Sequence, residues 1–103
     1  MLTLEAVSTA AIVEALRGIE DPEIGSDIVE LGLIYQIEIA AAGRVRVVMT
    51  TTTRNCPASA FIVEAVKAKI EQMESVSEAS VDLVHDPAWS PEMIGKGFGR
   101  SRP

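Results

Sequence analysis

The sequence TTTTRNCPASAFIVEAV at residues 50–66 marks the place where a strand is predicted to end, a short loop to turn and a helix to begin. Pro57 suits the first helical position, because its missing N–H has no intrahelical partner there and its φ is already helical. Cys56, the only cysteine, then falls at or beside the N-cap. The positive end of the helix dipole biases a thiol there toward the thiolate, which binds metal or attacks an electrophile. The alternative is that Cys56 is a small buried apolar residue.

Length and composition predict one ordinary soluble domain. The chain has 103 residues, of which 48% are hydrophobic and 23% charged, and domains cluster around 100 to 150 residues, by a rough count. We expect a single domain over residues 1–103, with an ordered core over about 8–94 and a flexible C-terminal tail over 95–103.

The same features exclude several classes of function. No apolar run approaches the roughly 20 residues that span a bilayer, and no signal peptide pattern is present, so we expect no membrane association. A single cysteine forms no internal disulfide, which favours the reducing cytoplasm. The net charge of -6 argues against a nucleic-acid partner, because phosphates are met by basic stripes.

Upstream of the opening stretch, the chain predicts a helix followed by two turns. Apolar residues from Ile12 to Ile19 recur at helical spacing and predict a helix over about residues 9–18. The sequence DPEIG at residues 21–25 carries Asp, Pro and Gly where a turn favours them, and by itself it favours an ordinary Asp-Pro turn. DIVE at residues 27–30 has the spacing of a capping box and predicts one helical turn.

Two alternating stretches predict a β-hairpin. Apolar and polar residues alternate over 33–39 and again over 44–49, with small turn residues at 40–43 between them. Polar residues of the two strands are expected to face one another on the more exposed face, with Arg44 and Arg46 across from Glu38 and Gln36.

A helix and a third strand complete the predicted fold. Apolar residues at helical spacing, Phe61 among them, predict a core helix over about residues 57–73. Residues 79–84 alternate as a third strand, which a right-handed crossover places parallel to the second. The order helix-strand-strand-helix-strand predicts an α+β fold, a two-layer α/β sandwich with a small mixed sheet.

The C-terminal residues predict a packing segment. Trp89, Met93 and Ile94 are bulky enough to cover an open edge of the domain, and this role is favoured over a binding role. Ser90-Pro91-Glu92 suits the cap of a last short helical turn.

The predicted topology gathers polar residues at one edge of the sheet. Parallel second and third strands place Cys56 and His85 at the same edge, and the acidic turn with Asp21 and Glu23 lies near the start of the antiparallel first strand. Threonine hydroxyls and Arg54 join them. One cysteine and one histidine make no closed zinc site, so the cluster is suited to a metal or an anion but is incomplete in one chain.

Several blocks of sequence resemble a known family. They are DPEIG at 21–25, IVELGLIY at 28–35, Met49-Thr50 leading to Cys56-Pro57, and PAWSPEM at 87–93. In this order and spacing they resemble the iron-sulfur cluster assembly factors that include SufT and the N-terminal domain of PaaD.

The resemblance implies an α+β domain that serves the maturation of iron-sulfur proteins and is not an enzyme. It implies that Cys56 is the functional thiol and metal ligand. Asp21 and Glu23 in the acidic turn, and Thr52 and Thr53 before the cysteine, are implied to complete the cofactor-binding site. Arg54-Asn55, Thr51 and Ala88 depart from the family's common residues, so the loop is expected to differ in shape or charge.

Three hypotheses follow from these residues. The first is a carrier in which Cys56 holds iron or an iron-sulfur cluster transiently, in a homodimer or with client apoproteins and the assembly machinery, because a cluster usually needs four thiolates or substitutes. The second is an adaptor that binds clients through the Trp89 segment without metal. The third is a Cys-dependent sulfur-transfer or redox enzyme that uses Cys56 with His85. A simple anion site also stays open.

Overall fold

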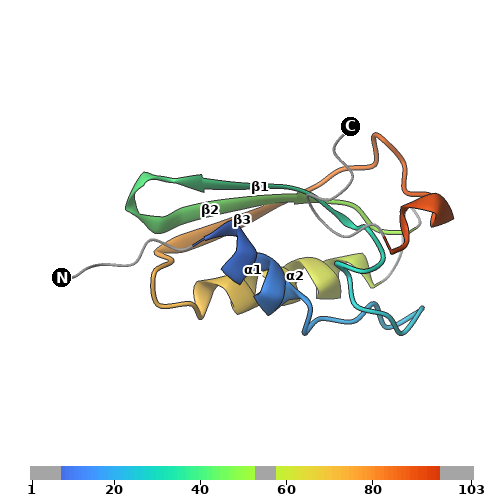
Figure 1. Ribbon diagram of the computed structural model, residues 1–103, viewed down its shortest axis with the longest axis horizontal. Helices are drawn as coiled ribbons and strands as arrows, with labels where there is room; N and C mark the ends of the chain where they lie inside the picture. Colours follow the sequence, from blue (N-terminus) through green and yellow to red (C-terminus); the bar gives the residue numbers. More distant parts are fainter. Residues whose placement is uncertain (1–7, 53–57, 96–103) are drawn as a thin grey trace.

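Two helices cover one face of a three-stranded sheet and leave the other face open (Figure 1). The computed structural model describes residues 8–52 and 58–95. The helices are α1 (Thr9–Leu16) and α2 (Ser59–Glu71), and the strands are β1 (Ile34–Ala40), β2 (Arg44–Met49) and β3 (Glu78–Leu83). Short 3-10 helices span Ala41–Gly43 and Pro91–Met93. The predicted α+β two-layer fold and the order of its elements are confirmed.

The first helix is shorter than predicted. The Ser8 hydroxyl accepts a hydrogen bond from the Ala11 N–H at 3.1 Å and caps the start of α1. Gly18 donates to the Ala15 carbonyl at 3.2 Å, three residues back, so the last turn tightens and α1 ends at Leu16. Ile19 is nevertheless buried with the core.

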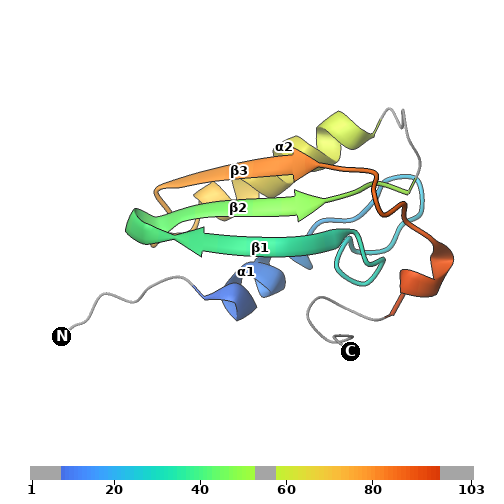
Figure 2. The same ribbon diagram turned by 90° about the horizontal axis from the view of Figure 1, so that it is seen from above.

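The strands lie in the order β1-β2-β3, as Figure 2 shows from above. β1 is antiparallel to β2 and β3 is parallel to β2, as the sequence predicts. The hairpin register differs by two residues from the prediction, because only Ala41–Gly43 form the turn and Ala40 stays in β1. Arg46 therefore lies across from Glu38, and Arg44 lies across from Ala40.

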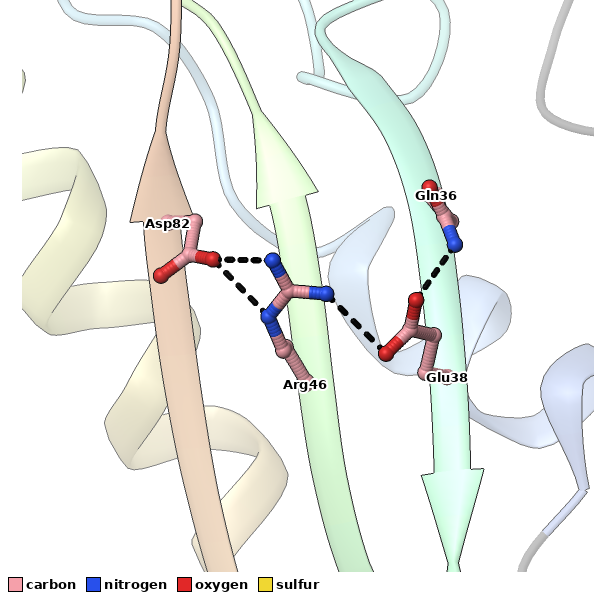
Figure 3. Close-up of polar contacts among 4 residues, drawn as sticks. All are labelled: Gln36, Glu38, Arg46 and Asp82. Atoms are coloured by element: carbon pink, nitrogen blue, oxygen red, sulfur yellow. Dashed lines mark hydrogen bonds and ion pairs between the residues drawn. The ribbon is translucent and has the colours of Figure 1, made fainter.

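Charged side chains cover the open face of the sheet. Arg46, on the central strand, donates to Asp82 on β3 and to Glu38 on β1, and Gln36 also donates to Glu38 (Figure 3). The Nη1–Oε1 distance to Glu38 is 3.0 Å. The hydrogen bond to Asp82, and then that to Glu38, raises the pKa of the Arg46 guanidinium. All three charged side chains are nearly half exposed, so this face is solvated.

Helix α2 packs one apolar stripe against the sheet. Ile62, Val66 and Ile70 are fully buried at the i, i+4, i+8 spacing of a single helical face. Phe61, predicted to belong to this stripe, is 60% exposed. It lies one residue before Ile62, about 100° around the helix from the stripe.

The start of α2 also differs from the prediction. The helix begins at Ser59 with Ala58 as its cap residue, not at Pro57 with Cys56 at or beside the N-cap. Pro57 and Cys56 themselves lie outside the described residues.

The outer edge of β3 is partly covered by a helix side chain. Glu71 accepts hydrogen bonds from the Ala79 N–H at 3.1 Å and from Lys67 at 3.0 Å. These bonds, that of Ala79 first, lower the pKa of Glu71. A charged side chain at an edge strand hinders pairing with another chain.

The segment from residue 85 to 95 is attached to residues 30–35. Trp89 Nε1 donates to the Leu31 carbonyl at 2.6 Å, and the Tyr35 hydroxyl donates to the Pro87 carbonyl at 2.7 Å. Trp89 and Met93 are partly buried, as predicted. Ile94 is 46% exposed, so its predicted covering role is wrong.

The last helical turn forms at Pro91–Met93 as expected, but the Ser90 side chain makes no capping hydrogen bond. The Ser90 backbone carbonyl instead accepts from the Met93 N–H at 3.0 Å. The turn is therefore closed by the main chain alone.

Candidate functional site

Polar segments gather at the end of the sheet opposite the β1–β2 hairpin (Figures 1 and 2). We call this the loop end and define it by four segments: the turn at 21–26, residues 50–52 after β2, residues 58–59 at the start of α2, and His85 after β3. The sequence analysis predicts the site residues at this edge of the sheet. The predicted site residues Thr53 and Cys56, with Arg54, lie outside the described residues, within the connection from β2 to α2.

The loop end holds the buried polar side chains of the described chain. Asp21 and Thr50 are 0% exposed and Thr51 is 2% exposed. Burying a polar group costs free energy unless it finds partners. The residues therefore need either internal partners or a ligand.

Asp21 organises its own turn. Its Oδ1 accepts from the Glu23 N–H at 2.8 Å, and its backbone carbonyl accepts from the Gly25 N–H at 2.7 Å. Gly25 has a φ of +86°, which glycine adopts without a steric penalty. This much is the ordinary Asp-Pro turn that residues 21–25 predict.

The second carboxylate oxygen of Asp21 is different. Oδ2 is buried and has no hydrogen-bond partner in the described residues. An unpaired buried acceptor costs about 1–3 kcal/mol, and such an atom in a folded protein calls for an explanation such as a bound water, ion or ligand. Glu23, two residues further along the chain, is exposed. Its carboxylate could therefore contact a ligand of Asp21 only from the surface side.

The next turn forms one half of the predicted capping box, but residues 27–32 make a turn and not the predicted helical turn. Asp27 Oδ1 accepts from the Glu30 N–H at 2.7 Å, and the Asp27 carbonyl accepts from the Leu31 N–H at 3.0 Å. Gly32, with a φ of +81°, ends this turn. The acidic turn is thus followed by a rigid connection into β1.

Backbone hydrogen bonds continue the sheet into the loop end. Thr50 donates its N–H to the Leu33 carbonyl at 2.9 Å, and Val84 donates to the Met49 carbonyl at 2.8 Å. Burial raises the pKa of the Tyr35 phenol, and a hydrogen bond with Thr50 opposes that shift. The chain is therefore held in place up to the point where it enters the segment that carries Cys56.

Three side chains meet beside that segment. Ser59 Oγ donates to Thr51 Oγ1 at 3.3 Å, and His85 Nε2 lies 3.3 Å from the same oxygen. His85 is half-buried. Thr52, a predicted site residue, is also half-buried and occupies a bend directly after Thr51.

The structure joins some of the sequence candidates and keeps others apart. His85 lies beside Thr51, as the parallel pairing of β2 and β3 predicts. The hydrogen bonds that Asp21 makes with the described residues stay within its own turn. Ser59 was missed by the sequence analysis, because a helix start at Pro57 places it inside the first turn. Its signal was a hydroxyl residue close to the start of an apolar stripe.

Among residues 8–52 and 58–95, no three or more His, Cys, Asp or Glu side chains lie together as a metal site. The same residues contain no helix long and apolar enough to cross a membrane.

Comparison with known proteins decides the family. The model of the family described as iron-sulfur cluster assembly protein matches residues 9–82. The chain belongs to the iron-sulfur cluster assembly protein family. The family resemblance read from the sequence is therefore confirmed.

Relatives within this family carry consistent names. An Fe-S protein maturation auxiliary factor of Porphyromonas gingivalis is 42% identical over 82% of this chain and 81% of its own length. The maturation factor SufT of Staphylococcus aureus is 34% identical over 74% of this chain and 86% of its own. An iron-sulfur cluster carrier protein of Synechocystis is 33% identical over 75% of this chain, which covers only 22% of the carrier.

A solved structure supports the fold assignment. A conserved hypothetical protein of Thermotoga maritima superimposes with a TM-score of 0.80 at 36% identity, over 89% of this chain and 90% of that one. The iron-sulfur cluster assembly protein family thus accounts for both the sequence blocks and the two-layer fold.

Proposed function

We propose that this protein is an iron-sulfur maturation factor that holds iron or an iron-sulfur cluster as a transient cargo at the loop end. Cys56 is the thiolate ligand, Asp21 and Glu23 supply carboxylates, and Thr52 and Thr53 shape the approach to the thiol. The names of the relatives support the cargo. The protein acts by binding and delivery rather than by catalysis.

One observation carries this proposal. Asp21 is fully buried, yet its Oδ2 has no partner among the described residues. A carboxylate oxygen is a hard ligand that suits a cation such as iron. This oxygen lies at the loop end, and the described residues leave it free to accept from a ligand.

The cargo needs ligands from outside one chain. A cluster is usually held by four thiolates or substitutes, whereas the chain has one cysteine and the described residues offer no three-ligand group. We therefore propose that the site is completed by a second copy in a homodimer, or by a client apoprotein or a component of the assembly machinery. Shared ligation also makes release to a client easier, because the cargo is not enclosed by one chain.

Anaerobic reconstitution with ferrous iron and sulfide tests the proposal. Visible absorption, iron content and native mass are compared for the unaltered protein, Cys56→Ser and Asp21→Asn. We expect uptake with two chains per cluster, no uptake by Cys56→Ser, and an affinity for iron reduced about 10-fold or more in Asp21→Asn.

Glu38→Gln is the matched control, because it neutralises an exposed carboxylate on the open face of the sheet. It should bind cargo as the unaltered protein does. Equal uptake by all four proteins, or uptake by none, contradicts direct cargo binding at the loop end.

A second candidate function is the adaptor without metal. Trp89 is partly buried and donates to the Leu31 carbonyl, whereas Phe61 is 60% exposed in the first turn of α2. An exposed aromatic side chain is a typical anchor for a protein partner. The adaptor predicts that Phe61→Ser abolishes client binding while Cys56→Ser preserves it.

A further inference from the structure

The outer side of β3 carries backbone groups that pair with no strand in the described chain. β3 is the last strand in the order β1-β2-β3 and pairs only with β2 (Figure 2). In a parallel pair, alternate residues direct their N–H and C=O groups to opposite sides. The Val84 N–H bonds to the Met49 carbonyl on β2, so Ala79, Val81 and Leu83 direct their backbone groups outward. We call this row of three residues the β3 edge.

Only the first residue of the β3 edge has a partner within residues 8–52 and 58–95. The Ala79 N–H donates to the Glu71 carboxylate at 3.1 Å, which confirms that this residue faces outward. The outward N–H groups of Val81 and Leu83 have no acceptor in the same part of the chain. Unpaired N–H and C=O groups in a row are a template for an added strand.

The opposite edge of the sheet is protected. The register of β1 shifts between Ile34 and Gln36, as in a β-bulge, and the Tyr35 hydroxyl donates to the Pro87 carbonyl of the segment from residue 85 to 95. A bulge twists an edge away from a second strand. β3 has no such irregularity, because its register with β2 is continuous from end to end. Of the two edges, that of β3 is therefore suited to receive a strand.

Apolar side chains border the β3 edge on the face that α2 covers. Leu83 is 37% exposed. Val63 is partly exposed and shares one helix row, at steps of four residues, with Lys67 and Glu71. Because Glu71 contacts Ala79, this row lies along β3. An added strand would thus find apolar contacts on this face.

Acidic side chains border the β3 edge on the open face. β3 itself carries Glu78 and Asp82 and no basic residue. Arg46 bonds to Asp82 but is shared with Glu38 (Figure 3). Arg44 lies across from Glu78, but both arginines belong to β2, one strand further from the edge. The open face beside the edge therefore favours basic side chains on an added strand.

We propose that the β3 edge docks an extended segment of another protein in which basic and apolar residues alternate. Its backbone pairs with Val81 and Leu83, its apolar side chains pack beside Leu83, and its basic side chains lie beside Glu78 and Asp82. The net charge of -6 favours the approach of such a segment. A second copy of this chain fits less well, because it would bring two acidic strands together. This docking goes beyond the proposed function and does not depend on Cys56.

Backbone amide hydrogen exchange, followed by NMR, tests the proposal with a blocked synthetic peptide of alternating lysine and valine. In the free protein we expect the Val81 and Leu83 amides to exchange faster than those of Ser80 and Asp82, which face β2. Saturating peptide should slow exchange at Val81 and Leu83 about 10-fold or more. A peptide of alternating glutamate and valine should leave these rates unchanged, because like charges repel.

Two variants with matched exposure locate the site. Leu83→Lys adds a cation beside the β3 edge and should weaken binding of the lysine-valine peptide about 10-fold. Ile39→Lys changes a side chain of nearly equal exposure on β1, 38% against 37%, and should change binding by less than about two-fold. Urea unfolding identifies any loss that comes from global destabilisation. Equal weakening in both variants, or in neither, overturns the proposal.

The exchange rates also identify other occupants of the β3 edge. Slow exchange at Val81 and Leu83 in the free protein overturns the proposal. Slowing that depends on protein concentration then indicates a second copy, and slowing that does not indicates cover by the chain itself. Peptide binding that leaves both amides unprotected places the peptide elsewhere and also overturns it. Because the protein is tested without iron or sulfide, the outcome is independent of cargo binding at the loop end.

Discussion

Polar side chains are exposed to solvent on the open face of the sheet and buried at the loop end. On the open face, Arg46 lies between Glu38 and Asp82 with all three side chains nearly half exposed. At the loop end, Asp21, Thr50 and Thr51 are buried. Water satisfies the first group at little cost, while the second group needs partners within the fold or a ligand. The difference teaches that changes at the loop end should be felt strongly and those on the open face weakly.

The largest expected effect compares two glycines near the loop end. A Cβ at Gly32 lies 2.7 Å from the Met93 carbonyl oxygen, whereas a Cβ at Gly25 meets nothing within 4 Å. Both have positive φ. Gly32→Ala should cost roughly 2–5 kcal/mol of unfolding free energy, the sum of left-handed strain and overpacking, and Gly25→Ala only about 1–2 kcal/mol.

Urea denaturation measures both variants. Equal losses mean that the close contact between Gly32 and Met93 adds nothing to the strain of a positive φ.

A smaller loss of stability is expected from removing the Tyr35 hydroxyl, which donates to the Pro87 carbonyl. Tyr35→Phe removes the hydrogen bond to the Pro87 carbonyl and should cost about 0.5–1.5 kcal/mol. In the unaltered protein, burial raises the pKa of Tyr35 above 10.0. The folded state thus favours the neutral phenol. The stability that Tyr35 contributes is fully present below pH 10 and is lost as the pH rises through the folded-state pKa of Tyr35.

An ultraviolet titration of the single tyrosine locates this pKa. A midpoint at or below 10 contradicts the buried environment.

Arg46→Ala should have a smaller effect than Tyr35→Phe. The variant removes both ion pairs of the open face, but exposed pairs are screened by solvent and salt. We expect a shift in the urea midpoint that is smaller than that of Tyr35→Phe and shrinks further at 1 M salt. A shift in the urea midpoint larger than that of Tyr35→Phe would contradict the expectation that changes on the open face have weak effects.

The smallest expected effect is the acid dependence of Glu71. Hydrogen bonds from Ala79 and Lys67 lower its pKa below the usual 4.5. A lowered folded-state pKa adds stability above about pH 4.5, and that stability is lost as pH falls through the folded-state value. The stability difference between the unaltered protein and Glu71→Gln should therefore be present at neutral pH and vanish in acid, as urea midpoints measured across this range will show.

The errors of the sequence analysis have local physical causes. Phe61 was assigned to the core because it is apolar, although helical geometry sets it about 100° from the Ile62 stripe. The hairpin register moved by two residues because a three-residue turn with positive φ at Ala42 and Gly43 replaced the expected four-residue turn. Each error concerns where an element ends or which of its residues face the core, whereas the type of the element was predicted correctly.

The candidate site was predictable only in part. Strand order and the right-handed crossover predict that His85 lies near the threonines after β2. The structure places His85 Nε2 3.3 Å from Thr51 Oγ1. The contact of Ser59 with Thr51 depended on where α2 begins, which a periodic pattern defines only to within a few residues. The Oδ2 of Asp21, which has no partner within residues 8–52 and 58–95, had no sequence signal, since residues 21–25 have the pattern of an ordinary turn.

By itself, the sequence determined the order of the helices and strands, the mixed three-stranded sheet and the family, because apolar periodicity, turn residues and motif spacing are local properties of the chain. Which polar groups are buried, and which partners they have, follows from the packing of the folded chain. The bonds from Trp89 to Leu31 and from Tyr35 to Pro87 each join residues more than 50 positions apart. Burial and pairing depend on where distant segments meet, and that is a property of the packed chain.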